Sequence, residues 1–69
     1  MKITINGQTK ELPAANNLQD VISRFCKDER SSNRIISEVN GHIVKSNQRQ
    51  ATPIKDGDTI ELVSFVGGG

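Results

Sequence analysis

The residues that most clearly suggest a chemical reaction are the last three, Gly67, Gly68 and Gly69. They directly follow the apolar segment 59–66. A terminal glycine pair is the chemical handle of proteins whose own C-terminal carboxylate is the substrate. Glycine has no Cβ, so its backbone can pass through a narrow active-site channel and its carbonyl is unhindered. The carboxylate of Gly69 would react only after activation, usually as an acyl-adenylate. A frayed tail or a leftover linker has the same composition. The tail alone therefore does not distinguish a reactive C-terminus from a segment without function.

Four other side chains could do chemistry, and each has a simpler structural explanation. Cys26 is the last apolar residue of a helical stripe, where a free cysteine packs as a small hydrophobe. His42 follows a turn without companions for metal or nucleophilic chemistry, which is typical of a surface strand. Asp56 and Asp58 flank Gly57, and the hydrogen bonds of a turn account for them better than calcium or acid–base catalysis. We therefore expect no catalytic residue and no metal site, and the chain itself is not expected to be an enzyme.

Composition narrows the class of protein and its partners. Sixty-nine residues make one small domain with a net charge of +1 and mixed charges along the chain. Without Trp or Tyr and with two Phe, an aromatic pocket or a base-stacking surface is not expected, and no basic stripe suggests nucleic acid. No membrane span or signal peptide is evident, and one cysteine fits a reducing compartment. These features predict a cytoplasmic domain with no bound cofactor and with neither nucleic acid nor membrane as a partner.

Hydrophobic periodicity and turn residues predict the elements that position the tail. The Asn-Gly pairs at 6–7 and 40–41 are strong hairpin signals, because both central residues of a type I′ turn need positive φ. Strands are predicted at 2–6, 8–12, 34–39, 42–44 and 59–66. The segment 45–52 is polar and is predicted to be weakly structured, and Asp56-Gly57-Asp58 is predicted to form a tight turn.

One helix carries the single long apolar stripe. Asn16 or Asn17 is its expected N-cap, and Asn16 with Gln19 has the capping-box spacing. The stripe recurs with helical periodicity and consists of Leu18, Val21, Ile22, Phe25 and Cys26. The helix must cover one face of a mixed sheet, because neither element can bury its apolar face alone. We therefore predict an α+β fold, a β-grasp with the first and last strands parallel at the centre, over residues 1–66, followed by a flexible glycine tail at 67–69.

The last strand has apolar residues on both faces. Ile60 and Leu62 are expected to face the helix, and Val63 and Phe65 the opposite side. Because one helix cannot cover both faces, an apolar outer face indicates a surface where a partner docks. A fully buried central strand is the alternative explanation. We assign Val63 and Phe65 to partner docking.

The whole chain resembles the ThiS family of small sulfur carriers of thiamin biosynthesis. The resemblance is carried by Ile3-Thr4-Ile5-Asn6-Gly7, by the segment 39–44, by the segment 54–62 and by the ending Phe65-Val66-Gly67-Gly68-Gly69. The family often has a proline and an aromatic residue where this chain has Lys45 and Arg49, and an apolar residue at Ser37. The resemblance therefore does not predict how this region packs.

The resemblance implies a ubiquitin-like β-grasp fold and a tail chemistry with several partners. An E1-like adenylyltransferase (ThiF-like) would use ATP to adenylate Gly69. A cysteine desulfurase or sulfurtransferase would supply the sulfur of a thiocarboxylate, and a thiazole synthase (ThiG-like) would receive it. Three alternatives stay open, namely a carrier like the small subunit of molybdopterin synthase, a ubiquitin-like protein modifier, and a plain binding module with an incidental tail.

Overall fold

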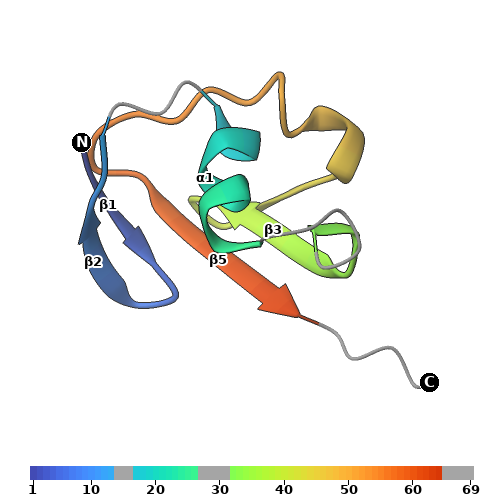
Figure 1. Ribbon diagram of the computed structural model, residues 1–69, viewed down its shortest axis with the longest axis horizontal. Coiled ribbons are helices and arrows are strands. Elements are labelled where there is room, and N and C mark those ends of the chain that lie inside the picture. The colour runs from blue at the N-terminus through green and yellow to red at the C-terminus, as the bar shows by residue number, and fades with distance from the viewer. Residues whose placement is uncertain (14–16, 27–31, 65–69) are drawn as a thin grey trace.

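The computed structural model describes residues 1–13, 17–26 and 32–64. Within these residues the elements are, in chain order, β1 (Lys2–Ile5), β2 (Gln8–Glu11), α1 (Leu18–Phe25), β3 (Ile35–Val39), β4 (His42–Val44), the 3₁₀ helix η1 (Ser46–Gln48) and β5 (Thr59–Ser64). The described strands form a five-stranded sheet in the order β2-β1-β5-β3-β4 (Figure 1).

The first and last strands lie side by side and parallel, as predicted. Thr4 of β1 pairs with Thr59 of β5, whereas β1–β2, β3–β4 and β3–β5 pair antiparallel. The helix α1 lies across one face of this mixed sheet (Figure 1). The predicted α+β fold, a ubiquitin-like β-grasp with a mixed sheet packed on one main helix, is thereby confirmed.

Both Asn-Gly hairpins form where the sequence places them. Asn6 and Gly7 have φ values of 49° and 80°, and Asn40 and Gly41 have 51° and 86°. Two successive positive φ values define a type I′ turn, whose twist matches that of the flanking strands. The turns therefore set the register in which β1 meets β2 and β3 meets β4.

The helix begins at the second of its two candidate caps. The side-chain oxygen of Asn17 accepts a hydrogen bond from the backbone N–H of Asp20 at 2.9 Å, whereas Asn16 lies outside the described residues. Along the stripe, the apolar residues of the first two turns are completely buried. Phe25 is 43% exposed, so its expected place in the core is wrong. The helical spacing sets the direction of Phe25, but it does not determine whether other elements reach far enough to cover the last turn.

The core lies between α1 and the helix-facing side of the sheet. Its buried members come from both layers and from the segment before β5, and they are Ile3, Ile5, Leu18, Val21, Ile22, Ile54 and Ile60. Cys26 packs against this cluster and is partly buried, which confirms its predicted core role. Aliphatic burial of this kind supplies most of the free energy that holds a small domain folded.

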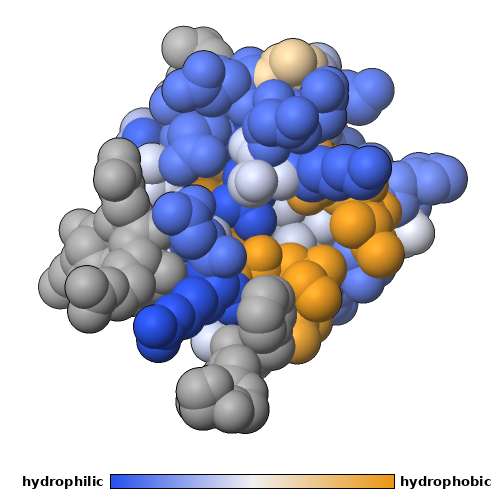
Figure 2. Space-filling view, turned by 90° about the vertical axis from the view of Figure 1, so that its right-hand side faces the viewer, coloured by the Kyte–Doolittle hydropathy of each residue, from blue (hydrophilic) through white to orange (hydrophobic). Residues whose placement is uncertain are grey.

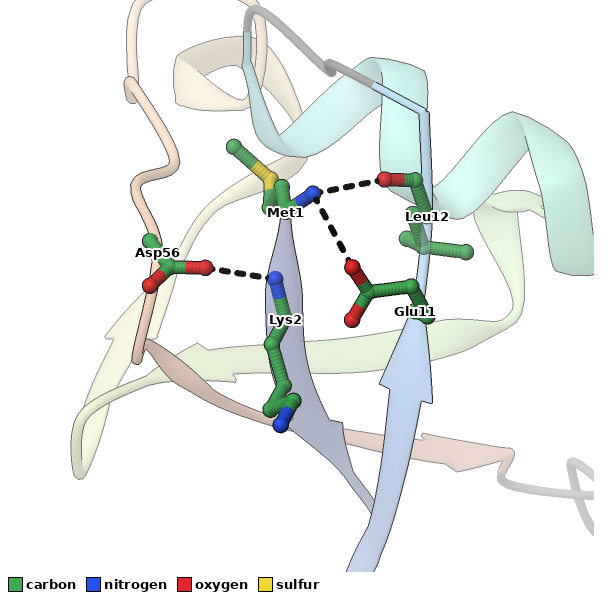
Figure 3. Close-up of polar contacts among 5 residues, drawn as sticks. All are labelled: Met1, Lys2, Glu11, Leu12 and Asp56. Atoms are coloured by element: carbon green, nitrogen blue, oxygen red, sulfur yellow. Dashed lines mark hydrogen bonds and ion pairs between the residues drawn. The ribbon is translucent and has the colours of Figure 1, made fainter.

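The N-terminus is fastened to the sheet by polar contacts (Figure 3). The ammonium group of Met1 donates a hydrogen bond to the carbonyl of Leu12 at 2.9 Å and lies 3.8 Å from the carboxylate of Glu11. The backbone N–H of Lys2 donates to the carboxylate of Asp56 at 2.6 Å. Asp56 thus ties the turn before β5 to the start of β1, which places these two strands side by side.

The polar segment after β4 is better ordered than its composition predicts. Its Arg49 is only 3% exposed, and its Nε donates to the Ser37 hydroxyl at 3.2 Å. Nη1 and Nη2 donate to the carbonyls of Ser32 and Ile35, each at 2.9 Å. The Ser37 hydroxyl, itself fully buried, donates to the carbonyl of Val44 at 2.9 Å. The expectation of weak structure was wrong because the partners of Arg49 are distant in sequence.

Candidate functional site

The strand β5 ends at the side of the sheet from which the tail must leave. Its last residue, Ser64, pairs with Ile35 at the beginning of β3. The glycine tail, Gly67–Gly69, and Phe65 lie outside the described residues. Five residues separate Ser64 from the C-terminal end of Gly69, and five extended residues span at most about 18 Å. An enzyme that reacts with the carboxylate of Gly69 must therefore approach the end of β5 closely.

The two faces of β5 differ as the alternation predicts. On the helix side Ile60 is completely buried and Leu62 is partly buried. On the outer side Val63 is 51% exposed. The outward orientation predicted for Val63 is confirmed, and the corresponding placement of Phe65 stays a prediction.

Two neighbouring strands extend the apolar surface around Val63. Ile36 of β3 pairs directly with Val63, and Ile43 of β4 pairs with Glu38, which lies on the same face of β3 as Ile36. Ile36 is 41% exposed and Ile43 is 70% exposed. We call Ile36, Ile43 and Val63 the outer apolar patch.

Figure 2 shows exposed hydrophobic side chains on the side of the molecule toward which β5 runs. A pocket of about 500 Å³ opens beside the outer apolar patch, with Ile36 and Ile43 among its lining residues. The sequence analysis assigned only Val63 and Phe65 to partner docking and did not identify Ile36 or Ile43. The alternation within 42–44 carries that information only once the register between β3 and β4 is known.

The remaining candidate residues have structural surroundings. His42 is exposed on β4, as predicted. Asp58 is 5% exposed, and its carboxylate accepts hydrogen bonds from the backbone N–H of Lys55 at 2.8 Å and from the side-chain amide of Asn40 at 3.0 Å. It therefore joins the turn before β5 to the second hairpin, which confirms a role in turn formation.

Neither a metal site nor a membrane-spanning helix is found among the described residues. No group of three or more His, Cys, Asp or Glu side chains in this part of the chain is placed to hold a metal ion. Likewise, no helix in the described ranges is long and apolar enough to cross a bilayer. What the described residues offer is a central strand, β5, that leads toward the tail, with the outer apolar patch beside it.

Comparison with known proteins assigns this arrangement to a family. Residues 3–69 match the ThiS family. The crystal structure of the thiamine biosynthesis protein (ThiS) from Geobacter metallireducens is 31% identical, with a TM-score of 0.79 and complete coverage of both chains. A solution structure of a thiamine biosynthesis protein from the same organism is 30% identical with a TM-score of 0.78, covering all of this chain and 88% of that one.

A longer protein also contains a segment similar to this chain. It is the thiazole synthase of Paramagnetospirillum magneticum, which is 30% identical over 69 residues. All of the present chain is matched, and it spans only 20% of that protein's length.

Proposed function

The chain belongs to the ThiS family, and on this premise we propose that it is a sulfur carrier of thiamine biosynthesis. The observation that carries the proposal is the family match, which extends over residues 3–69 and includes the glycine tail. The similar Geobacter structure, described as a thiamine biosynthesis protein, supports the same pathway. In this function the domain is a co-substrate and not a catalyst.

The proposed chemistry takes place on the carboxylate of Gly69. On an E1-like adenylyltransferase, a carboxylate oxygen attacks the α-phosphorus of ATP, and pyrophosphate leaves. The terminal sulfur of a persulfide, loaded by a cysteine desulfurase or sulfurtransferase, attacks the acyl carbon of the adenylate, and AMP leaves. A second thiol then cleaves the acyl disulfide, leaving a thiocarboxylate on Gly69 and a disulfide on the donor. ATP binding and the electrostatics of both displacements belong to the partners.

The chain contributes a handle and a surface to this cycle. Gly67 and Gly68 make the segment before the reacting carboxylate thin enough for a narrow channel. Val63 and Phe65 would contact the adenylyltransferase that takes the tail. The observed exposure of Val63 at the end of the central strand supports this docking role.

We propose that a thiazole synthase receives the sulfur. The supporting observation is the Paramagnetospirillum thiazole synthase, one fifth of which is similar to this chain. Joining two modules in one polypeptide raises the effective concentration of each for the other, which is useful when they act in succession.

Intact-mass spectrometry tests the proposal directly. The chain is incubated with an E1-like adenylyltransferase from the same organism, ATP and a persulfide donor. We expect a mass increase equal to the difference between sulfur and oxygen, and no increase in a matched variant that lacks Gly68 and Gly69 and so has no terminal glycine pair. The variant should keep the melting temperature of the parent, because the glycines have no side chains to pack.

Other mass patterns would contradict the proposal. A ladder of conjugates with other proteins would indicate a protein modifier. An unchanged mass would indicate a binding module without tail chemistry. A thiocarboxylate that serves molybdopterin synthase but not thiazole synthase would move the carrier to a different pathway.

A further inference from the structure

Two glutamates lie directly opposite each other at the centre of the outer sheet face. Glu38 of β3 pairs directly with Glu61 of β5, and both side chains are half-buried. Side chains that are directly opposite on antiparallel strands have Cβ atoms about 4.5–5.5 Å apart, and like charges in this arrangement destabilise the sheet. Among the described residues no cation lies within ion-pair distance of either carboxylate. The ion pair found in this part of the chain is elsewhere, between the ammonium group of Met1 and Glu11. Within the described part of the chain, no ion pair therefore offsets these two negative charges.

The acidic pair is bordered by the outer apolar patch. Ile43 is directly opposite Glu38 on β4, while Ile36 and Val63 form the next outward-facing pair toward the end of β5. The surface therefore has negative charge next to exposed aliphatic side chains, on the strand that leads into the tail. Buried at an interface, such a surface needs a cation opposite the carboxylates and apolar groups opposite the patch.

We propose that the outer face of β3, β4 and β5 is the docking surface for thiazole synthase, with an arginine of the synthase bound between Glu38 and Glu61. A guanidinium fits because its planar fork can donate to two carboxylates at once. Apolar side chains of the synthase cover Ile36, Ile43 and Val63. The choice of occupant rests on the proposed function and on the relative in which a similar segment belongs to a thiazole synthase.

A structural role and a docking role for the acidic pair predict opposite changes in stability. If the pair serves binding, replacing a carboxylate with an amide relieves repulsion in the free domain and removes an attraction in the complex. The double variant Glu38→Gln/Glu61→Gln should therefore melt at the same or a higher temperature than the parent. Its dissociation constant for thiazole synthase should rise at least about tenfold.

The experiment is a binding titration of the full chain with thiazole synthase from the same organism, at low and high salt, beside thermal melts. The control is Glu11→Gln, the same change on edge strand β2 of the same sheet, which should leave affinity within about twofold. Added salt should weaken the parent complex more than the complex of the double variant. Glu61→Lys should stabilise the free domain by pairing with Glu38, yet bind worst of all.

Three results would overturn the proposal. The first is an affinity of the double variant within about twofold of the parent. The second is a lowered melting temperature with weaker binding, which would make the pair structural. The third is a parent chain that does not bind the synthase. Because the titration needs neither ATP nor a sulfur donor, a chain that binds normally but forms no thiocarboxylate would refute the proposed function and leave the docking surface standing.

Discussion

The helix-facing side of the sheet is filled in two different ways. Under α1 it is aliphatic, with Ile22 and Ile60 completely buried. Toward β4 it contains Ser37 and Arg49, which are 0% and 3% exposed and linked by hydrogen bonds. Both regions exclude water equally well. Side-chain volume sets the stability of the aliphatic region, whereas the polar region depends on three specific acceptors for one guanidinium.

Truncation in the aliphatic region should have the largest effect on stability. Ile22→Ala should lower the free energy of unfolding by about 3 kcal/mol, because it removes buried methylenes and leaves a cavity. Phe25→Ala on the same helix is the control and should lose clearly less, since that side chain is 43% exposed. Urea denaturation of both variants measures the difference. Equal losses would mean that the last turn of α1 is as well packed as its centre.

Removing the guanidinium should have the next largest effect. Arg49→Met keeps much of the side-chain volume but leaves the Ser37 hydroxyl and the carbonyls of Ser32 and Ile35 without their donor. We expect a loss of about 2 to 3 kcal/mol in urea denaturation. Arg49→Lys should recover only part of it, because one ammonium group cannot reproduce the fork. A methionine variant as stable as the parent would show that the polar region adds nothing over an apolar one.

A double-mutant cycle sharpens the contrast between the two regions. Combining Ser37→Val with Arg49→Met removes both members of a buried pair. The double variant should therefore lose about 1 kcal/mol less unfolding free energy than the two single variants lose together. Ser37→Val combined with Thr9→Ala, on the far edge strand β2, is the control and should be additive. Additive losses in the Ser37–Arg49 cycle would mean that their hydrogen bond contributes nothing measurable to the free energy of unfolding.

The outer face should show the smallest effect on stability and a separate effect on binding. Val63→Ala should change the free energy of unfolding by less than about 0.5 kcal/mol, and Leu62→Ala by more, since Leu62 faces the core.

Phe65→Ala should weaken binding to the adenylyltransferase by roughly 1–3 kcal/mol, because buried aromatic residues carry much interface energy. Denaturant melts and binding titrations of the three variants test this. An unfolded Phe65 variant with a harmless Leu62 change would reverse the assignment of the two faces.

Local chemistry made much of the fold predictable from the sequence. The Asn-Gly pairs impose positive φ, which few other residues tolerate, and the hairpins occur where they predict. The spacing of Leu18, Val21 and Ile22 identified the buried side of α1, and the alternation along β5 separated Ile60 from Val63. The assignment of the glycine tail depends on its composition and on the family resemblance, so it needs no tertiary contact.

Tertiary structure decided the features that depend on residues distant in sequence. Arg49 reads as a surface residue in a polar segment, yet its acceptors lie 12 to 17 positions away. The outer apolar patch and the opposition of Glu38 and Glu61 exist only in the register that brings β3 between β4 and β5. Periodicity predicts the face of the sheet on which each side chain of a strand lies. Which side chain lies beside it depends on strand pairing, and that is settled by packing across the whole domain.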